Sequence, residues 1–493
     1  MTQYPITLGG LKKMGYRCKP VKEEMRDNLL ARLRAGTPLL PGIVGYEETV
    51  LKQLVNAILS RHDLLLLGLR GQGKTRLLRQ LASFLDERIP ILAGSEINDD
   101  PFAPVSRYGL DLVREKGNES PVEWIGRERR YGEKLATPDV SMADLIGDID
   151  PVKAINQKLG YGNEGAIQFG IIPRTNRGIF VINELPDLQA RIQVGLLNIM
   201  EERDIQIRGF RVRIPLDLMM AFSANPEDYT NRGNIITPLK DRIDSQIITH
   251  YPKNPETAAR ITRQEAWMDR EGSAANPVIP ELVQLLVEQI AFEAREDKDY
   301  VDQKSGVSAR LPISAMELLG SAVELRGALA GNPSPKARLS DLESVIPAIT
   351  GKLELVFAGE QEGPVNIARA MVGKATRTLF HRHFQDPYNK KEKQPEENPY
   401  YPVISWFEKG NTLTLGDRMG DADYRKALDS VPGLKKVMAK CALDPAVLEK
   451  DRANEDLYME LLLEGLHLHS RLSKENLTEG FVYRDMMSDI LKR

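Results

Sequence analysis

A short glycine-rich segment carries the strongest chemical signal in this sequence. Residues 68–75 read Gly-Leu-Arg-Gly-Gln-Gly-Lys-Thr and follow the apolar run Leu64–Leu67, so they match the pattern G-x-x-x-x-G-K-[ST] in a strand–loop–helix context. In such a loop the glycines let backbone N–H groups surround phosphate oxygens, the lysine adds a positive charge, and the hydroxyl is a ligand for Mg²⁺. The pattern predicts that a nucleoside triphosphate and Mg²⁺ bind at Gly68, Gly71, Gln72, Gly73, Lys74 and Thr75.

Polar residues at the ends of two later apolar strands are candidates for hydrolysis, which the loop alone does not perform. The run Ile179–Ile182 is followed by Asn183 and Glu184, and the run Leu216–Phe222 leads into Ser-Ala-Asn-Pro, which contains Asn225. Beside the phosphate-loop strand, Glu184 would polarise the attacking water. Asn225 would hydrogen-bond the water or the γ-phosphate, although Asn-Pro is also a common turn pair.

Arginine residues form two further candidate sites. Arg242 lies in Asp-Arg-Ile, which says little alone, but arginine stabilises the charge that develops in phosphoryl transfer. Arg127, Arg129 and Arg130 form a basic cluster that fits either a solvated loop or contact with nucleic acid or an acidic partner. Because the net charge is −3, we do not expect nucleic acid as a partner.

Composition indicates an ordinary soluble protein of several domains. Its 493 residues suggest about three domains, and no apolar run approaches the ~18 residues that span a bilayer. The N-terminus lacks the features of an export signal, and only two cysteines occur, far apart. We therefore expect a cytoplasmic protein without disulfide bonds.

The first half of the chain has the pattern of an α/β domain, because buried apolar runs alternate with helical periodicity. The expected strands are Leu64–Leu67, Ile89–Ala93, Ile179–Ile182 and Leu216–Phe222. The expected helices are Val21–Leu33, Glu47–Ser60, Thr75–Leu85 and Asp187–Glu202. Alternation over Ile205–Ile214 predicts a β-hairpin that carries Arg208, Arg211 and Arg213 on one face.

The second half reads as helical from about residue 254. Amphipathic segments predict helices at Glu281–Glu293, Ser314–Leu329 and Glu343–Phe357, and helices again from about Tyr424 to the end. The proline-rich, charged stretch 386–402 predicts a linker or loop. The expected organisation is a lead-in (1–36), an α/β core (37–253), a helical lid (254–385), the linker (386–402) and a helical C-terminal extension (403–493).

The order of these motifs resembles the AAA+ ATPase core, in particular the helix-2-insert group with the MoxR-type ATPases and the magnesium chelatase I subunit. Local similarities extend to Ile43-Val44-Gly45, Asp144-Leu145-Ile146-Gly147, Arg177-Gly178-Ile179-Phe180 and Gly306-Val307-Ser308-Ala309-Arg310. The resemblance covers roughly residues 37–330. It implies a P-loop AAA+ parallel-sheet domain followed by a helical lid and a mostly helical C-terminal extension.

The resemblance also implies a role for each matching residue. Lys74 and Thr75 would serve the ATP phosphates and Mg²⁺, Glu184 would be the hydrolytic base and Asn225 the sensor of the γ-phosphate. Ile43, Val44 and Gly45 would border the adenine. Arg242 would act in the neighbouring subunit's site, and Arg310 would be the sensor from the lid. The loop around Ile167–Pro173 would be the helix-2 insert, and Ile205–Ile214 the pre-sensor hairpin.

One departure concerns Asn183, which stands where the family usually has Asp. An amide keeps the oxygen but loses the charge that helps hold hydrated Mg²⁺. Three readings follow: a MoxR-type ring motor or chaperone, expected to be a hexamer; a magnesium-chelatase-like metal-insertion subunit; and a slow, nucleotide-gated scaffold or regulator. Relatives of this type work with a von Willebrand A domain partner, which would here be a separate protein, since its Asp-x-Ser-x-Ser motif is absent from this chain.

Overall fold

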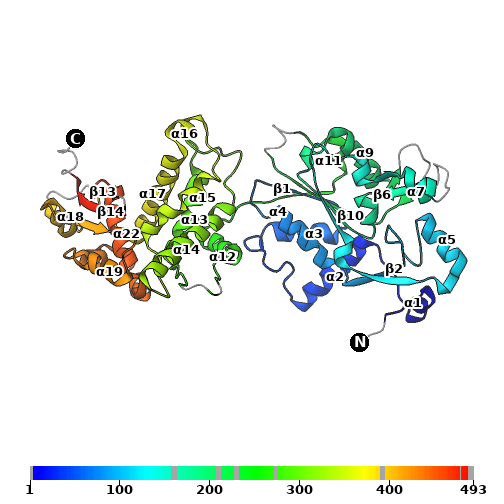
Figure 1. Cartoon of the computed structure of the whole chain (residues 1–493), viewed down its shortest axis with the longest axis horizontal. Coiled ribbons are helices and arrows are strands. Elements are labelled where there is room, and N and C mark those ends of the chain that lie inside the picture. Colours follow the sequence, from blue (N-terminus) through cyan, green and yellow to red (C-terminus); the bar gives the residue numbers. More distant parts are fainter. Residues whose placement is uncertain are drawn as a thin grey trace. The chain divides into compact units, whose positions relative to one another are not determined.

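The structure is a computed structural model that describes residues 4–156, 164–206, 213–226, 233–270, 272, 275–388, 395–477 and 479–486. The chain divides into two compact units, residues 1–251 and 252–493. Each unit has its own arrangement of helices and strands (Figure 1). The first unit contains the phosphate loop.

The first unit mixes helices with short strands. Its helices are α1 (Leu8–Met14), α2 (Val21–Ala35), α3 (Val50–Leu59), α4 (Lys74–Gln80), α5 (Arg107–Lys116), α6 (Met142–Leu145), α7 (Pro151–Asn156), α8 (Ile171–Arg174), α9 (Ala190–Glu201) and α11 (Thr237–Arg242). Its strands are β1 (Leu64–Leu67), β2 (Arg88–Leu92), β3 (Val122–Gly126), β4 (Tyr131–Leu135), β5 (Gly147–Ile149), β6 (Ile167–Phe169), β7 (Gly178–Asn183), β8 (Asp204–Gln206), β9 (Arg213–Pro215), β10 (Leu218–Ala224) and β11 (Ser245–Ile248).

A five-stranded parallel sheet in the order β11-β1-β10-β7-β4 forms the centre of this unit. Leu67 of β1 is aligned with Ala224 of β10, and Ile182 of β7 with Phe222 of β10. Strands β1, β7 and β10 therefore end at one edge of the sheet, here called the carboxyl edge. The expected α/β class with a parallel sheet is confirmed.

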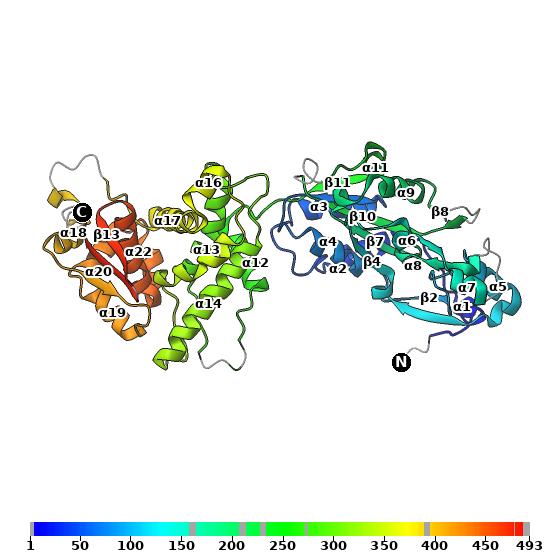
Figure 2. The same cartoon turned by 45° about the horizontal axis from the view of Figure 1, so that its top comes forward.

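Successive strand residues face two separate cores, because side chains alternate across a sheet. Leu65, Phe180 and Phe222 pack with α9 and α11 on one face. Leu66 and Val181 pack with α2, α3 and α4 on the other, and the two helix groups lie on opposite sides of the sheet in Figures 1 and 2. Burial on both faces explains why these strands are almost wholly apolar.

Helix α2 is fixed to the opposite edge, where the parallel strands begin; we call this the amino edge. The backbone N–H of Val21 donates to Asp217 Oδ2 at 2.8 Å, and Lys22 Nζ lies 2.8 Å from Asp63 Oδ1. Glu24 forms a bidentate ion pair with Arg130, at 2.7 and 2.6 Å. Polar contacts thus join α2 to residues that precede β1, β4 and β10.

Several short strands lie outside the main sheet. The expected strand at 89–93 is present as β2, but it pairs antiparallel with β3 and not with the phosphate-loop strand. Strands β5 and β6 form another antiparallel pair, which includes part of the predicted insert. Strands β8 and β9 pair antiparallel as the predicted hairpin requires; residues 207–212, with Arg208 and Arg211, lie outside the described residues.

The second unit is mostly helical. Its helices are α12 (Pro255–Glu265), α13 (Glu281–Glu296), α14 (Arg310–Ala330), α15 (Ile346–Thr350), α16 (Phe357–Glu362), α17 (Pro364–His383), α18 (Tyr401–Glu408), α19 (Asp421–Asp429), α20 (Leu434–Cys441), α21 (Pro445–Lys450) and α22 (Glu455–Leu468). Its strands are β12 (Leu413–Leu415), β13 (Leu472–Leu477) and β14 (Gly480–Asp485). A single core contains residues from before and after the stretch 386–402.

Two predictions for this unit are wrong. The segment predicted as one helix over 343–357 is a 3₁₀ turn to Val345, then α15 to Thr350, and α16 begins only at Phe357. Helix does not continue to the end, because β13 and β14 form an antiparallel sheet with β12. Within this hairpin Phe481 and Tyr483 are two positions apart and both rings are buried. This spacing is typical of a strand, but in so short a segment it is hard to distinguish from a helical pattern.

Candidate functional site

The phosphate loop joins the end of β1 to the start of α4. Gly71 and Gly73 have φ values of 70° and 73°, in the left-handed region that glycine adopts without steric cost. A Cβ on Gly68 would lie 1.9 Å from Thr249 Oγ1 and 2.2 Å from Gln72 Oε1. The glycine pattern therefore has a geometric reason at each of these positions.

Lys74 is held by the loop itself. Its side chain is buried, and Nζ donates to the carbonyl oxygens of Gly68 at 2.5 Å and Leu69 at 3.0 Å. Thr75 follows as the second residue of α4 and is half-buried. The Lys74 ammonium group and the Thr75 hydroxyl thus directly follow the glycines of the loop.

Tyr46 connects the segment before α3 with the phosphate loop. Its single O–H is shared between Gln72 O at 2.6 Å and His250 O at 2.9 Å, and burial raises its pKa to about 12. The half-buried segment Ile43–Gly45 directly precedes Tyr46. The structure therefore brings the predicted adenine-bordering segment close to the loop through a tyrosine that sequence reasoning missed.

The carboxyl edge brings three predicted features together. The backbone N–H of Gly68 donates to Ala224 O at 3.1 Å, so the loop begins beside the end of β10. Asn225, which is 4% exposed, follows β10 directly, and Glu184 follows β7, the next strand in the sheet. Ligands of open α/β sheets bind at this edge.

Glu184 has an unusual backbone. Its φ and ψ are 56° and 48°, a left-handed conformation that costs a non-glycine residue about 1–2 kcal/mol. Its N–H donates to Ser223 Oγ at 3.2 Å. Strain of this kind concentrates at functional sites, where surrounding contacts maintain it.

Asn183 is buried and hydrogen-bonded on both sides of its amide. Its Nδ2 donates to Glu133 Oε1 at 2.8 Å, and its Oδ1 accepts from the Ser223 hydroxyl at 2.9 Å. Sequence reasoning missed Glu133 and the role of Ser223, because Tyr131–Leu135 contains no apolar run that marks a central strand. Glu133 is identified only by the pairing of its strand, β4, with β7.

Arg242 does not join the phosphate loop of its own chain. It ends α11 and donates to Glu201 Oε2 from Nε at 2.9 Å and from Nη2 at 2.6 Å. It also lines a cavity of about 530 Å³ with Asp63, Asp217 and Asp244, which precede β1, β10 and β11. Arg242 therefore lies toward the amino edge, opposite the loop.

Arg310 belongs to the second unit, where it is exposed and is the first residue of α14. Its backbone N–H donates to Ser308 Oγ at 3.1 Å. The predicted lid sensor is thus present on a helix of the expected unit, while its role stays a prediction.

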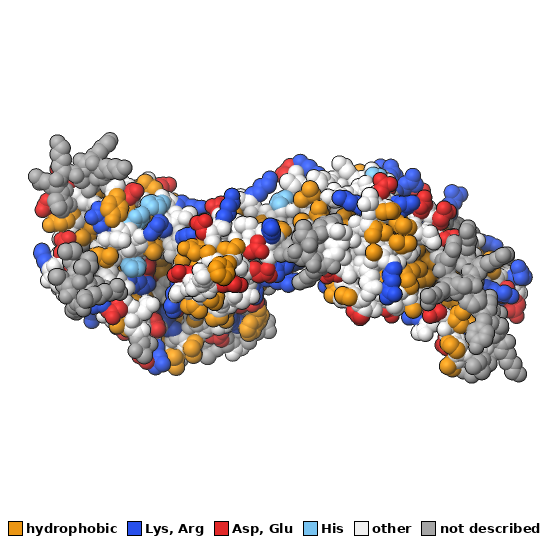
Figure 3. Space-filling model, turned by 90° about the horizontal axis from the view of Figure 1, so that it is seen from above, with side chains coloured by type: hydrophobic (Ala, Val, Ile, Leu, Met, Phe, Trp, Pro, Cys, Tyr) orange, Lys and Arg blue, Asp and Glu red, His pale blue; other side chains and the backbone are white. Residues whose placement is uncertain are grey.

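The basic cluster near residue 130 is used inside the chain. Arg130 is 1% exposed and paired with Glu24, and Arg129 lies 3.1 Å from Glu123. On the face drawn in Figure 3, basic and acidic side chains are interspersed and do not gather into one basic area. The contacts favour a structural use of this cluster.

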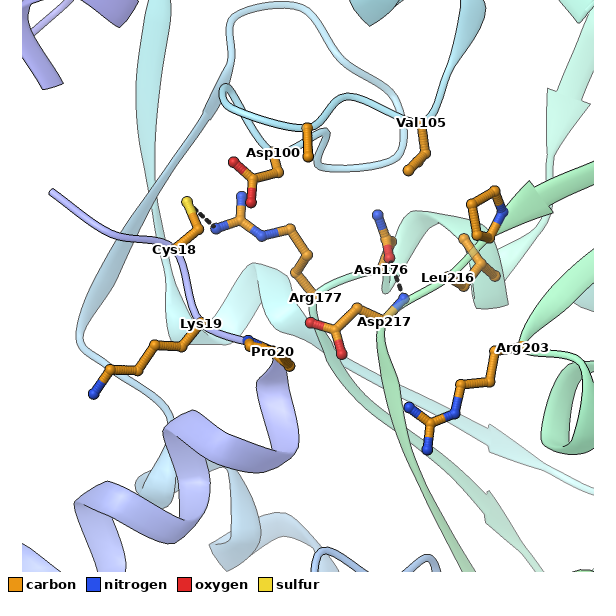
Figure 4. A pocket seen from close by; sticks show the side chains of 12 residues that line it. Cys18, Lys19, Pro20, Asp100, Val105, Asn176, Arg177, Arg203, Leu216 and Asp217 are labelled. Carbon is orange, nitrogen blue, oxygen red and sulfur yellow. Dashed lines mark hydrogen bonds between the residues drawn. The ribbon is translucent and has the colours of Figure 1, made fainter. Parts of the chain in front are cut away.

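A second cavity at the amino edge, of about 350 Å³, contains no residue of the phosphate loop. Figure 4 shows Cys18 pointing toward Arg177 there, with Arg177 Nη2 3.5 Å from Sγ. Burial raises the pKa of the Cys18 thiol to about 12, and burial also raises the pKa of Asp217 in the same cavity. The thiol therefore stays protonated at neutral pH and is a poor nucleophile.

The residues present fit a nucleotide with Mg²⁺. Mg²⁺ keeps several waters and takes one or two protein oxygens besides phosphate, which matches the Thr75 hydroxyl and the Asn183 amide oxygen. Among the residues that the structure describes, no group of three or more His, Cys, Asp and Glu could hold a metal ion by itself. In the same residues, no helix combines the length and the apolar character that a bilayer span requires.

No protein-family model matches the chain. Among solved structures, it is similar to a proposed ATPase from Cytophaga hutchinsonii, with 15% identity over 73% of this chain and 97% of that chain and a TM-score of 0.30. It is also similar to one chain in a structure of the complex between subunits BchI and BchD of magnesium chelatase, with 20% identity over 65% of this chain and 97% of that chain and a TM-score of 0.33.

NtrX from Brucella abortus matches with 12% identity and a TM-score of 0.35, over 60% of this chain. This chain spans 56% of the length of NtrX. These similarities carry no argument about activity. The structure of this chain itself defines the class: an α/β protein with a five-stranded parallel sheet and a phosphate loop between β1 and α4.

Proposed function

We propose that the chain binds ATP with Mg²⁺ and hydrolyses it. One observation carries the proposal: the phosphate loop, Asn225 and the strained Glu184 occupy the ends of neighbouring strands at the carboxyl edge. A triphosphate held by the loop would extend along this edge. The proposal therefore rests on the juxtaposition of a binding loop and two polar strand ends.

Each residue has a chemical role in this proposal. Lys74 would hold the β- and γ-phosphates, and Thr75 and Asn183 would hold the metal, which supplies charge neutralisation when bound. The Glu184 carboxylate would take a proton from the attacking water. Asn225 would hydrogen-bond the γ-phosphate or that water. Ile43–Gly45 would contact the base of the nucleotide.

Arg242 supports an assembly in which sites are shared. Its position toward the amino edge of its own chain suits an arginine that stabilises transferring phosphate in a neighbouring subunit. We propose a ring, expected to be a hexamer, in which Arg310 of the lid also senses the nucleotide. To enter a neighbouring site, Arg242 would exchange Glu201 for phosphate.

The ring would act as a motor of the MoxR or magnesium-chelatase type. ATP turnover would move the insert around Ile167–Pro173 and the hairpin Ile205–Ile214 against a client. The proposed partner is a separate protein with a von Willebrand A domain, which the motor would remodel or mature; metal insertion is the alternative. The cytoplasm is the proposed location.

Asn183 favours a second candidate function. With no negative charge at this position, the site would bind ATP and hydrolyse it slowly, as a nucleotide-gated scaffold or regulator would. The two candidates share the binding step and differ in the rate of turnover.

The test is steady-state ATP hydrolysis by the full chain with Mg²⁺, together with binding of a fluorescent ATP analogue. We expect Lys74→Ala to lose binding and Glu184→Gln to bind but not hydrolyse. Lys52→Ala, on the exposed face of α3, is the control and should behave as the unmodified protein. Hydrolysis unchanged by Glu184→Gln would refute the assigned base, and binding unchanged by Lys74→Ala would refute the site.

Shared sites have their own test. Arg242→Ala and Lys74→Ala should each be inactive alone and recover part of the activity when mixed, because mixed rings contain some interfaces with both intact residues. Absence of recovery, with ring formation confirmed by light scattering, would refute the trans role of Arg242.

A further inference from the structure

A chain of hydrogen bonds crosses three neighbouring strands at the carboxyl edge. Arg79 of α4 donates from Nε and Nη2 to the Glu133 carboxylate at 2.8 and 2.9 Å. Glu133 accepts from Asn183 Nδ2, Asn183 Oδ1 accepts from Ser223 Oγ, and Ser223 Oγ accepts from the N–H of Glu184. The chain therefore links the helix after the phosphate loop to the strained residue proposed as base.

The direction of every link is fixed by chemistry. The Glu133 carboxylate only accepts, and Ser223 uses its one proton toward Asn183 because the Glu184 N–H occupies its acceptor side. Residue 183 must consequently donate to Glu133 and accept from Ser223, which an amide does and a carboxylate does not. An aspartate at 183 would place two acceptor oxygens about 2.8 Å apart.

Glu133 is surrounded by hydrogen-bond donors. Arg79 donates to both carboxylate oxygens, and Asn183 donates to Oε1. Tyr131 donates to Oε2 at 3.1 Å. A negative charge is therefore present at this edge, but it lies on β4 at position 133 and not on β7 at position 183.

We propose that Glu133 is a positioning residue of the proposed hydrolytic site. It orients the Asn183 amide and, through Ser223, holds the backbone of Glu184 in its left-handed conformation. The amide at 183 and the carboxylate at 133 form a matched pair, so Asn183 is the residue that this edge requires and not a defect of the site. This inference rests on the proposed function for its effect on turnover.

The matched pair predicts an unusual pattern of rescue. In Asn183→Asp two carboxylates face each other, and in Glu133→Gln an amide donor faces either Asn183 Nδ2 or Arg79. In the double variant the new amide at position 133 accepts from Arg79 Nε through its oxygen and donates from its nitrogen to the new carboxylate at position 183, which still accepts from Ser223. The contact of Arg79 Nη2 with the atom that was Oε1 is lost, but the links between positions 133, 183 and 223 are restored.

The experiment compares these three variants of the full chain. We expect each single variant to lower ATP turnover by about ten-fold, the effect of one misplaced charged hydrogen bond, and the double variant to recover to within about three-fold of the unmodified protein. Affinity for the fluorescent ATP analogue should change little. Glu123→Gln, which removes an exposed pair on β3, is the matched control and should have no effect.

Thermal unfolding provides a readout that does not depend on turnover. In Asn183→Asp two acceptor oxygens face each other with no donor between them, so this variant should have a lower Tm than the unmodified protein. The double variant should recover most of this Tm deficit, whereas two unconnected sites would give additive losses.

Two results would overturn the pairing: a double variant as impaired as the two single effects combined, or an Asn183→Asp variant that hydrolyses ATP faster with an unchanged Tm. If neither the unmodified protein nor any of the variants hydrolyses ATP, the proposed function fails, while the recovery of Tm in the double variant still decides whether residues 133 and 183 are paired.

Discussion

Breaking the buried ion pair between Glu24 and Arg130 should strongly destabilise the first unit. Both side chains are almost fully buried, at 5% and 1% exposed. Arg130 Nε also donates to Arg177 O at 2.7 Å, and the N–H of Asp86 donates to Glu24 Oε1 at 2.6 Å. The three guanidinium nitrogens of Arg130 and the two carboxylate oxygens of Glu24 therefore all have partners. A buried ion pair is tolerated under this condition.

Glu24→Gln removes the negative charge and leaves the guanidinium buried. Removing one partner of such a pair costs about 3–5 kcal/mol, because the other charge stays desolvated. The control is Asp27→Asn on the same helix. Asp27 pairs with Lys19 at 2.6 Å, but the two side chains are 43% and 53% exposed, so its loss should cost within about 1 kcal/mol.

Hydrogen exchange read by mass spectrometry on peptides from β4 and β7 isolates this unit from the second one. Glu24→Gln should lower the opening free energy of these peptides by about 3–5 kcal/mol, and Asp27→Asn by about 1 kcal/mol or less. Replacing both partners, as Glu24→Leu with Arg130→Met, should recover part of the loss, because the Asp86 N–H and the Arg177 carbonyl still lose the hydrogen bonds that Glu24 and Arg130 provide. Equal effects of Glu24→Gln and Asp27→Asn would refute the reasoning.

Two further predictions concern the loop and the pH dependence of the second unit. Gly68→Ala should weaken binding of the fluorescent ATP analogue by at least about ten-fold, since its Cβ would overlap Thr249 and Gln72. The control is Gly420→Ala, whose Cβ meets no atom within 4 Å and which should leave binding unchanged. Equal effects of the two substitutions would contradict the steric argument. Burial raises the pKa of Glu288 from 4.5 to about 7. Because the pKa is higher in the folded chain, the contribution of Glu288 to the free energy of unfolding is fully present below about pH 4.5 and is lost as the pH rises toward 7. The loss is about 3 kcal/mol. Urea unfolding at pH 5 and pH 7.5 should show this loss and Glu288→Gln should reduce it; the same slope in both proteins would exclude Glu288 as its source.

The apolar strands of the main sheet were predictable from the sequence, whereas its two outer strands were not. β1, β7 and β10 are buried on both faces, so their composition alone identifies them. β11 exposes Gln246 and Ile248, and β4 carries Glu133 and Lys134. Edge strands such as β11 and β4 need fewer apolar residues than central strands. Their sequences therefore resemble those of loops until the strand that they pair with is known.

The candidate site was predictable in its parts and not in its connections. The loop, Glu184 and Asn225 each follow an apolar strand, a signal that lies within a few residues. The partners of Asn183 come from residues 133 and 223, which are separated from it by 50 and 40 positions. Only strand order brings them together. The sequence alone therefore made Asn183 look like a loss of charge, while the fold surrounds it with a carboxylate and a hydroxyl.

The attachment of α2 to the amino edge has a consequence for how the chain folds during synthesis. Val21 donates to Asp217, 196 residues later, and Glu24 meets Arg130 after 106 residues. At about 5–20 residues per second, the last of these partners emerges on the order of 10–40 s after the helix itself. Within that time the charges of α2 find their partners one after the other, because Lys22 meets Asp63 long before Arg130 is available to Glu24. Until Arg130 has been made, Glu24 must stay hydrated. A non-local closure of this kind slows folding, and α2 completes its contacts with the amino edge only after residue 217 has left the ribosome.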